Sequence, residues 1–268
     1  MKVLLCCLQY RAFTGSELYF HELSQGLREL GCDVSLISPR LGDPLKSQTS
    51  GVRFISLPEA RETYVDHIIF SHGAAVWGEI RNIRAKFVTN VLHSEVLEME
   101  APIDDERIDR YIGVRPSIVA QAPVTCDLVY NPFDRSRFNP QVGDGDSNVV
   151  CFPGTLDYLR VKPIRHLLLN SEHKGFRVLH IGRRDYEISH PNFRSLPATW
   201  EIEKHYASCA VVAGIMTGRT TIEGLLCGKR ALQFDVDRAG EITRVYWHQE
   251  TDLDKFDRKV VAKALINP

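Results

Sequence analysis

Short apolar runs alternate with amphipathic stretches along the first half of the chain. Residues 3–8 form an apolar run of the length expected for a buried strand. Residues 14–30 carry large apolar side chains at helical spacing, and Gly31 follows as a residue that can end a helix. Residues 33–38 return to the strand pattern. This order predicts strand, loop, helix and strand, the first unit of a Rossmann-like α/β domain.

The predicted helix begins with Thr-Gly-Ser-Glu at residues 14–17, which has the form of a capping box. We expect the Thr14 hydroxyl to accept from the Glu17 N–H, while the Glu17 carboxylate reaches back to the helix start. Gly15 would let a ligand approach the backbone closely, although a plain glycine at a helix start is an equal alternative. The unit lacks the pattern G-x-G-x-x-G, so a dinucleotide site is not indicated.

Further apolar runs of strand length follow in the first half, at residues 52–57, 67–71, 87–92, 111–114 and 127–130. A histidine directly follows two of these runs: His72 and His93. Ligands bind at the carboxyl ends of strands in open α/β sheets, so both histidines are candidate site residues. A structural role is the alternative for each.

Proline, glycine and acidic residues interrupt the pattern between residues 131 and 148, a composition typical of a linker. We therefore predict two domains, residues 1–140 and residues 141–268. The second domain repeats the alternation of the first. Its predicted strands are residues 149–152, 177–181, 209–215 and 231–234, and its predicted helices are residues 164–169, 199–206 (capped by Thr199), 222–227 and 252–265.

The clearest candidate site lies between the last two of these strands. Its loop and helix start contain hydroxyls, a glycine and an arginine, namely Thr217, Gly218, Arg219, Thr220 and Thr221. The first N–H groups of a helix lack intrahelical acceptors and lie at the positive end of its dipole, so they attract phosphate. Glu223, on the first turn or two of that helix, is placed to reach the hydroxyls of a ribose. An ordinary strand–helix–strand unit is the alternative.

A second glycine turn, at Gly154, follows the strand predicted at residues 149–152. Arg160 and Lys162 come next, ahead of the helix predicted from residue 164. Basic residues beside a glycine turn suit a diphosphate, which carries two or more negative charges. Ordinary surface charge is the alternative for both residues.

Length, charge and cysteine spacing further limit the classes of protein to which the chain can belong. The chain has 268 residues, which suits two small domains, and 33 Lys and Arg residues against 34 Asp and Glu residues give a net charge of −1. This balance argues against nucleic-acid binding through the whole surface. The seven cysteines lack C-x-x-C spacing, which indicates reduced, buried thiols in a cytoplasmic protein rather than a zinc site. No apolar run is long enough for a signal peptide or a membrane span.

The order of these features resembles that of the retaining, nucleotide-sugar-dependent glycosyltransferases of the GT-B fold (family 4-like), and the resemblance covers nearly the whole chain. Four stretches carry it: T-G-S-E-L-Y-F-H-E-L at residues 14–23, V-Y-N-P-F-D-R-S-R-F-N-P at residues 129–140, C-F-P-G-T-L-D-Y-L-R-V-K-P at residues 151–163 and G-R-T-T-I-E-G-L-L-C-G-K-R-A-L at residues 218–232. The resemblance implies two Rossmann-like domains facing across a cleft, with the donor held mainly by the second.

The same resemblance implies transfer of a sugar from a nucleoside-diphosphate sugar, without a metal or another cofactor. It places Arg160 or Lys162 at the donor diphosphate and His93 at the donor sugar, as the catalytic residues. The remaining donor-binding residues would be Glu223 at the ribose, Gly15 and Gly154 against the diphosphate, and Thr217, Gly218, Arg219, Thr220 and Thr221 at the sugar and phosphates.

Three departures from the family's pattern bear on activity. Ile215 stands where the family usually has a glutamate, and Thr155 stands where it has an arginine after the loop glycine. The chain is also short for this fold, so loops that shape the acceptor site are expected to be trimmed. A binding or partner subunit without transfer activity, and a sugar-nucleotide epimerase or hydrolase, are therefore the alternatives. The acceptor is left open among a glycan, a small molecule, a lipid-linked sugar and a modified nucleic-acid base.

Overall fold

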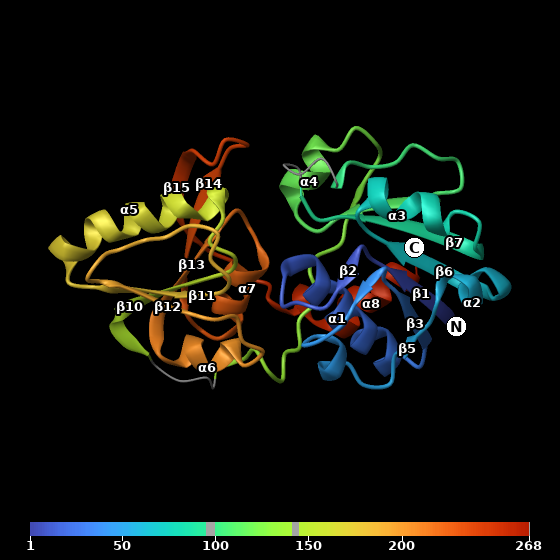
Figure 1. The fold of residues 1–268 in the computed structure, drawn as a ribbon, viewed down its shortest axis with the longest axis horizontal. Helices are drawn as coiled ribbons and strands as arrows, with labels where there is room; N and C mark the ends of the chain where they lie inside the picture. The colour runs from blue at the N-terminus through green and yellow to red at the C-terminus, as the bar shows by residue number, and fades with distance from the viewer. Residues whose placement is uncertain (95–99, 141–144, 268) are drawn as a thin grey trace. The chain divides into compact units, whose positions relative to one another are not determined.

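The chain forms two compact units in a computed structural model that describes residues 1–94, 100–140 and 145–267 (Figure 1). Unit 1 comprises Met1–Phe133 together with Asp254–Pro268, and unit 2 comprises Asp134–Leu253. The sequence places the boundary near residue 140 and assigns the last predicted helix to the second domain. The structure instead places that helix in unit 1, because it packs on the first helix of the chain.

Unit 1 contains a seven-stranded parallel sheet in the order β5-β3-β1-β6-β7-β8-β9. Its strands are β1 (Lys2–Cys6), β3 (Asp33–Ile37), β5 (Arg53–Phe54), β6 (Tyr64–Phe70), β7 (Arg84–Leu92), β8 (Arg110–Gly113) and β9 (Asp127–Leu128). Its helices are α1 (Gly15–Glu29), α2 (Leu57–Glu62), α3 (Gly73–Ile80), α4 (Pro116–Gln121) and α8 (Arg258–Ile266), and β2 (Gln9–Tyr10) pairs with β4 (Arg40–Leu41) in a small separate ribbon.

The sheet of unit 1 is covered on both faces. Four successive residues of β1, from Val3 to Cys6, are buried, which requires packing against each side of the strand. On one face Leu4 and Phe70 pack with Trp77 of α3 in a single apolar cluster. The strand patterns of the sequence are thus explained by burial in a parallel sheet.

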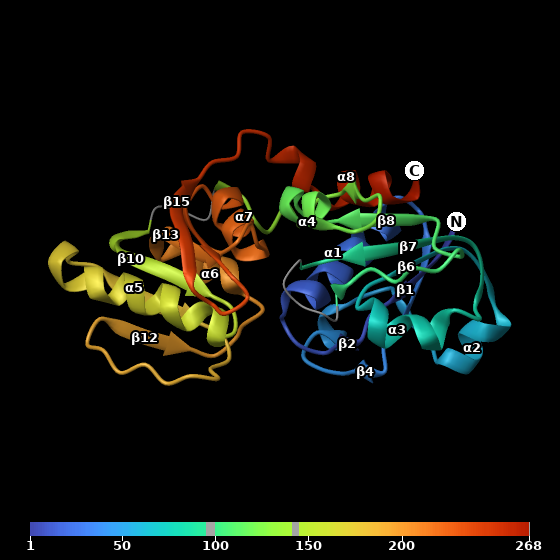
Figure 2. The same cartoon turned by 90° about the horizontal axis from the view of Figure 1, so that it is seen from above.

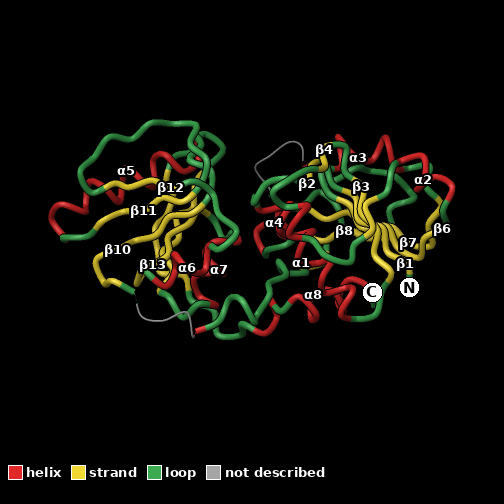
Figure 3. Tube along the Cα trace, turned by 60° about the horizontal axis from the view of Figure 1, so that its bottom comes forward, coloured by secondary structure: helices red, strands yellow, loops and turns green. Residues whose placement is uncertain are grey.

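Unit 2 contains a six-stranded sheet, which Figures 2 and 3 show from two directions. Its strand order is β12-β11-β10-β13-β14-β15, and only the pairing of β14 with β15 is antiparallel. Its strands are β10 (Asp146–Pro153), β11 (Arg177–Ile181), β12 (Phe193–Leu196), β13 (Cys209–Ile215), β14 (Arg230–Val236) and β15 (Ile242–His248). Its helices are α5 (Tyr158–Lys174), α6 (Ile202–Ala207) and α7 (Arg219–Leu226). The prediction of an α/β chain with two Rossmann-like domains is confirmed.

Both sheets reverse their strand order at a corresponding place. The chain runs from β1 to β3 on one side and returns to β6 on the other, and it runs likewise from β10 to β11 and then to β13. Loops that leave neighbouring strands in opposite directions open a crevice at such a switch point, outside the carboxyl ends of the strands. The candidate site is therefore expected beside the ends of β10 and β13 in unit 2, and beside those of β1 and β6 in unit 1.

Two predicted helix starts in unit 2 are wrong. Helix α5 begins at Tyr158, because the Asp157 side chain accepts from the N–H groups of the first turn and caps the helix there. Arg160 and Lys162 consequently lie within the helix rather than before it. Helix α6 begins after Glu201, and Thr199 does not cap it, since its hydroxyl instead accepts from the Glu201 N–H at 3.2 Å.

The hydrogen bonds predicted for the capping box of α1 are also wrong. The Thr14 hydroxyl donates to the Glu17 carboxylate instead of accepting from a backbone N–H. The other carboxylate oxygen of Glu17 accepts from the N–H groups of Arg11 and Ala12, each at 3.0 Å. The buried glutamate therefore fixes the loop that precedes the helix.

The last helix is shorter than predicted. A 3₁₀ turn, Asp254–Phe256, precedes α8, and the Asp257 carboxylate caps the helix by accepting from the N–H of Lys259 at 2.8 Å. Val260 is exposed, and the buried face of α8 consists of Val261, Ala262 and Leu265.

The prediction of buried thiols holds for five of the seven cysteines. All seven cysteines are free, and Cys6, Cys7, Cys151, Cys209 and Cys227 are buried, whereas Cys32 and Cys126 are partly exposed. Burial raises the pKa of the Cys227 thiol to about 12, so this thiol is protonated near neutral pH. Within residues 1–94, 100–140 and 145–267, no helix is long and apolar enough to cross a membrane.

Candidate functional site

Gly154 forms the turn at the carboxyl end of β10, at the switch point of unit 2. Its φ of +118° lies in the region that favours glycine. A Cβ atom at this position would lie 2.9 Å from Nε of Arg160, so the arginine side chain covers the turn. The structure thus brings together the predicted glycine turn and one of the two predicted basic residues.

Arg160 and Lys162 point to different sides of α5, as expected for residues two apart in a helix. Arg160 Nη1 lies 2.7 Å from the carboxylate of Asp157, and its side chain is 25% exposed. Lys162 instead pairs with Glu241 on the surface, where both side chains are largely solvated. Only Arg160 lies against the Gly154 turn.

The loop between β13 and α7 begins with a residue in a rare backbone conformation. Met216 has a φ of +50°, which costs conformational free energy in any residue other than glycine. Its N–H donates to the Phe234 carbonyl at 2.7 Å, and its carbonyl accepts from the Gly218 N–H at 2.7 Å. Such strain is found preferentially at functional sites.

Helix α7 begins after Gly218, whose carbonyl accepts the first helical hydrogen bond from Ile222 at 3.4 Å. The backbone N–H groups of Arg219, Thr220 and Thr221 precede that bond and lie at the positive end of the helix dipole. A Cβ atom at Gly214 would lie 2.7 Å from the hydroxyl of Thr220 and 2.9 Å from that of Thr221. The hydroxyls predicted at the helix start are therefore packed against the end of β13.

Gln233 supports this loop and was missed by the sequence analysis. The side chain is buried in β14 and accepts from the Thr217 hydroxyl at 3.2 Å, while its Nε2 donates to Asp235 at 2.9 Å and to Tyr246. Its signal in the sequence was a single amide inside the apolar run of residues 231–234, which marks a buried polar group in need of partners.

Glu223 lies inside unit 2 rather than on an open face of α7. Its Oε1 lies 2.8 Å from Nε of Arg219, one helical turn earlier, and its Oε2 accepts from the Tyr206 hydroxyl at 2.7 Å. Burial, and then the nearby Glu223 carboxylate, raise the pKa of Tyr206. The geometry therefore assigns Glu223 two protein partners beside the switch point.

The two histidines predicted at strand ends do lie near each other in unit 1, with ring centroids 6.3 Å apart. Glu100 joins them: its Oε1 lies 3.3 Å from Nε2 of His72, and its Oε2 accepts from the His93 N–H at 3.4 Å. His72 has a φ of +58°, and its Nδ1 lies 2.9 Å from the Ser71 hydroxyl. The strained residue after β6 thus corresponds in position to Met216 after β13.

Burial sets the protonation of this cluster. It lowers the pKa of His72 to about 4 and raises the pKa of Glu100 to about 7, so the imidazole is neutral near pH 7. The pKa of His93 lies well below its usual range, also through burial. The His93 ring packs against Tyr19, at 4.7 Å between centroids, and its Nε2 has no hydrogen-bond partner within the described part of the chain.

Gly15, the remaining predicted site residue, begins α1 at the carboxyl end of β1. A Cβ atom there would meet nothing within 4 Å, so the backbone of this helix start faces open space. A ligand could therefore approach the backbone closely at this residue.

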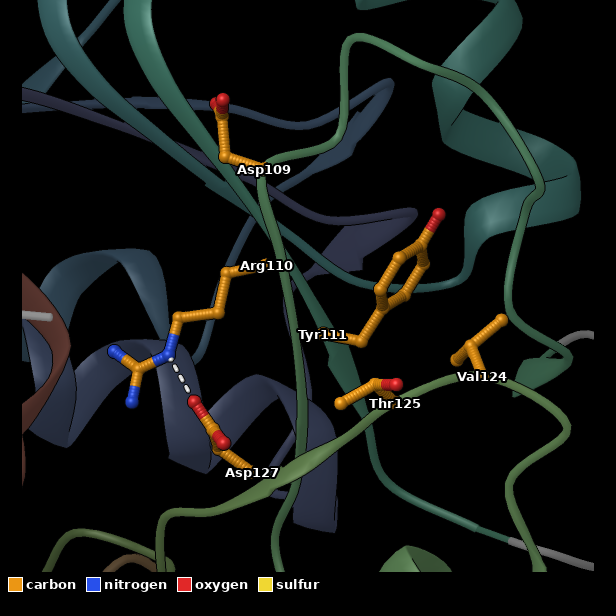
Figure 4. Close-up of a pocket in the computed structure, with 6 residues that line it drawn as sticks. All are labelled: Asp109, Arg110, Tyr111, Val124, Thr125 and Asp127. Carbon is orange, nitrogen blue, oxygen red and sulfur yellow. Dashed lines mark hydrogen bonds and ion pairs between the residues drawn. The ribbon is translucent and has the colours of Figure 1, made fainter.

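Two surface grooves lie at the opposite ends of the sheets. One, of about 420 Å³, is lined by residues at the start of β8 and β9: Asp109, Arg110, Tyr111, Val124, Thr125 and Asp127 (Figure 4). The other is lined by residues at the amino ends of β10, β11 and β12, among them Asp146, Arg177 and Arg194. Because open parallel sheets bind ligands at the carboxyl ends of their strands, neither groove is the candidate site.

No protein-family model matches the sequence, and no curated protein matches it. Solved structures match it in fold. Alr3699/HepE of Anabaena in complex with UDP and glucose superposes with a TM-score of 0.64, at 15% identity over 86% of this chain and 80% of that chain. An alpha-glucosyltransferase in complex with UDP and a 13-mer DNA containing a HMU base gives 0.63, at 12% identity over 87% and 80%.

A glycosyltransferase from Rickettsia africae ESF-5 matches with a TM-score of 0.58, at 13% identity over 99% of this chain and 93% of that chain. Identities this low show the fold alone. The fold is GT-B, with two Rossmann-like domains, as the sequence resemblance implied.

Proposed function

We propose that the chain is a glycosyltransferase that uses a nucleoside-diphosphate sugar as donor. The observation that carries this proposal is that the neighbouring strands β10 and β13 lead, at the switch point of unit 2, into the Gly154 turn and the start of α7, two places where backbone N–H groups can bind phosphate. Arg160 supplies a positive charge at the first of them. Neighbours of the same fold that hold UDP, with or without glucose, support a UDP-sugar as the donor to test first.

In this proposal the fixed charges and dipoles of unit 2 stabilise the leaving group. The bond between the anomeric carbon and the diphosphate oxygen breaks, the acceptor hydroxyl oxygen bonds to that carbon, and the hydroxyl proton passes to the departing diphosphate. Negative charge grows on the departing diphosphate, where the N–H groups of α7 and the Arg160 guanidinium meet it. No metal or further cofactor enters this scheme, and transfer with retention is part of the proposal.

The other assigned residues take roles around the donor. Glu223 would bind the ribose, Gly15 would contact the diphosphate, and His93 would offer its unpartnered Nε2 to the donor sugar. The acceptor stays open among a glycan, a small molecule, a lipid-linked sugar and a modified nucleic-acid base. The DNA-bound neighbour supports testing the last of these, although the net charge of −1 adds no support to it.

The Arg160 assignment predicts a difference between two neighbouring substitutions. Replacing Arg160 with alanine should raise the Kd for UDP by about 10-fold or more, because a charge-assisted contact contributes about 1.5–3 kcal/mol. Replacing Lys162 with alanine should change the Kd by less than about 2-fold, since this lysine pairs with Glu241 in solvent. Titration calorimetry of both variants measures the difference. An equal loss of UDP affinity in the two variants, or a loss in Lys162→Ala alone, would show that Arg160 is not the specific contact of the diphosphate.

The Glu223 assignment is tested with the substitution Glu223→Gln, which keeps the size of the side chain. If the carboxylate binds a ribose, the variant should bind UDP about 10-fold more weakly while its affinity for inorganic pyrophosphate stays unchanged. Calorimetry with both ligands separates these effects. An equal loss of affinity for both ligands would mean that Glu223 acts by holding Tyr206 and Arg219. Unchanged affinity for both ligands would exclude Glu223 from the site.

A second candidate function is that of a GT-B-like binding or partner subunit. Ile215 favours it, because this residue occupies the position of the family's usual glutamate and is buried in the apolar core of unit 2. Such a protein would bind UDP-glucose without turnover. Release of UDP from UDP-glucose, measured with and without a mixture of acceptors, distinguishes the candidate functions. Release only with acceptor supports a transferase, and release or sugar isomerisation without acceptor supports a hydrolase or epimerase. Saturable binding without turnover supports the binding subunit.

A further inference from the structure

A buried histidine holds the carbonyl group of the Gly154 turn. His180 lies in β11 with no exposed surface, and its Nε2 is 2.8 Å from the Gly154 carbonyl oxygen. Its Nδ1 is 2.8 Å from the hydroxyl oxygen of Ser195 in β12. A carbonyl oxygen can only accept, so Nε2 carries the proton and donates. Burial lowers the pKa of His180, so the ring is neutral and Nδ1 accepts from the Ser195 hydroxyl.

This hydrogen bond determines which way the next N–H points. The Gly154–Thr155 peptide is planar and trans, so its C=O and N–H groups point in opposite directions. With the carbonyl directed at His180, the Thr155 N–H is directed away from β11. The N–H groups of Gly154, Leu156 and Asp157 all donate to backbone carbonyls. For the Thr155 N–H, by contrast, no acceptor is found among residues 1–94, 100–140 and 145–267.

Close packing holds the carbonyl in this orientation. A Cβ atom at Gly182 would lie 2.0 Å from the Gly154 carbonyl oxygen, and Gly182 has a φ of +154°. A glycine is therefore needed at residue 182 for the carbonyl to occupy its place beside His180. On the same turn, the Arg160 side chain covers the position of a Gly154 Cβ atom.

We propose that His180 is a positioning residue for the donor site: by fixing the Gly154 carbonyl, it directs the Thr155 N–H toward the diphosphate of a nucleoside diphosphate. This inference rests on the proposed donor site of unit 2. It also gives a role to Thr155, which stands where the family that the sequence resembles usually has an arginine. The backbone N–H of Thr155 would contribute a contact to phosphate that does not depend on its side chain.

The test compares two substitutions of His180 with UDP and with uridine as ligands. In His180→Gln, the amide nitrogen takes about the place of Nε2 and still donates to Gly154, whereas in His180→Asn it takes the place of Nδ1 and does not reach. We expect His180→Asn to raise the Kd for UDP by about 10-fold and His180→Gln by less than about 3-fold. Uridine, which has no phosphate, should bind equally to all three proteins.

Each outcome separates the inference from the proposed function. If the wild-type protein binds UDP and His180→Asn binds it equally well, the inference is overturned while the donor site stands. If His180→Asn lowers the affinities for UDP and for uridine to the same extent, the histidine acts on the whole fold and the inference is again overturned. If the wild-type protein binds no nucleoside diphosphate, the proposed function fails, and the inference fails with it.

A measurement on the wild-type protein covers the case in which His180→Asn does not fold. The amide proton of Thr155, observed by NMR in ¹⁵N-labelled protein, should shift downfield when UDP is added, because a new charge-assisted hydrogen bond forms. Uridine should leave this resonance in place. Absence of a shift at saturating UDP would overturn the inference without any substitution.

Discussion

Replacing Gly26 with alanine should lower the free energy of unfolding by about 2 kcal/mol or more. Gly26 lies in α1 where α8 crosses it, and a Cβ atom there would be 2.3 Å from the Arg258 carbonyl oxygen and 3.2 Å from Cβ of Ala262. The contact is with helix backbone, which cannot rotate away as a side chain can. Helix α8 would have to move off α1 and weaken the ion pairs of Arg258 with Glu22, at 3.4 Å, and with Glu29.

A second helical glycine supplies the control for this prediction. Gly78 lies in α3, and a Cβ atom at this position would meet nothing within 4 Å. Gly78→Ala should therefore stabilise the protein by about 0.5–1 kcal/mol through helix propensity alone. Urea unfolding followed by circular dichroism measures both variants, and limited proteolysis reports release of α8. Equal stability changes in the two variants would contradict the close contact of α1 with α8.

Replacing Glu100 with glutamine should alter the pH dependence of stability. The pKa of Glu100 is raised from 4.5 to about 7 by burial, so the folded protein holds this proton at pH values where the unfolded chain has released it. The stability that Glu100 contributes is complete below pH 4.5 and is lost as the pH rises to 7. The variant does not titrate here, so its free energy of unfolding relative to the wild-type protein should rise over this window, by about 3 kcal/mol.

Replacing His72 with glutamine should have the opposite pH dependence. The pKa of His72 is lowered from 6.5 to about 4, so between these pH values the unfolded chain binds a proton at this residue and the folded protein does not. The stability that His72 contributes is complete above pH 6.5 and is lost as the pH falls to 4. Relative to the wild-type protein, the variant should therefore gain about 3 kcal/mol as the pH falls through this window.

Urea titrations between pH 4.5 and 7 measure both differences. Of the described residues, the other groups that shift the pKa values in this cluster are His93 and Arg115, and both remain in each variant, as does Tyr19 beside His93. Their contributions therefore cancel to first order in the comparison with the wild-type protein. Slopes of opposite sign are the expected result. Slopes of the same sign, or flat differences for both variants, would show that Glu100 and His72 do not hold the protonation states assigned to them.

The parallel core of the fold could be predicted from the sequence, because strands buried on both faces appear as short apolar runs. Strand β15 could not, since it lies at a sheet edge and carries exposed Arg244 and Trp247. Its stability comes from pairing with β14 and from contacts such as Arg230 stacked 3.8 Å from the Trp247 ring centre. Contacts of this kind leave no periodic signal in the strand itself.

The candidate site was predictable where chemistry is local in the chain. The Gly154 turn and the hydroxyl-rich start of α7 were recognised because a turn and a helix start use neighbouring residues. Glu100 was missed because it lies in a stretch rich in acidic residues, 95–106, a composition typical of a solvated surface. Its partners His72 and His93 follow two different strands, so no local pattern in the sequence joins the three residues. Glu223 was recognised, but its burial beside Tyr206 depends on the placement of α6, which the sequence pattern did not determine.

The return of the chain to unit 1 has a consequence for the order of events during synthesis. Asp134–Leu253 is a continuous segment that can complete its sheet as soon as it leaves the ribosome, whereas unit 1 needs α8, which is translated later. The face of α1 that carries Gly26 stays uncovered until then. Unit 2 should therefore reach its native structure first, although unit 1 begins to emerge earlier, and a stalled chain ending near residue 253 would expose Glu22 and Gly26 of α1, which are buried in the complete fold.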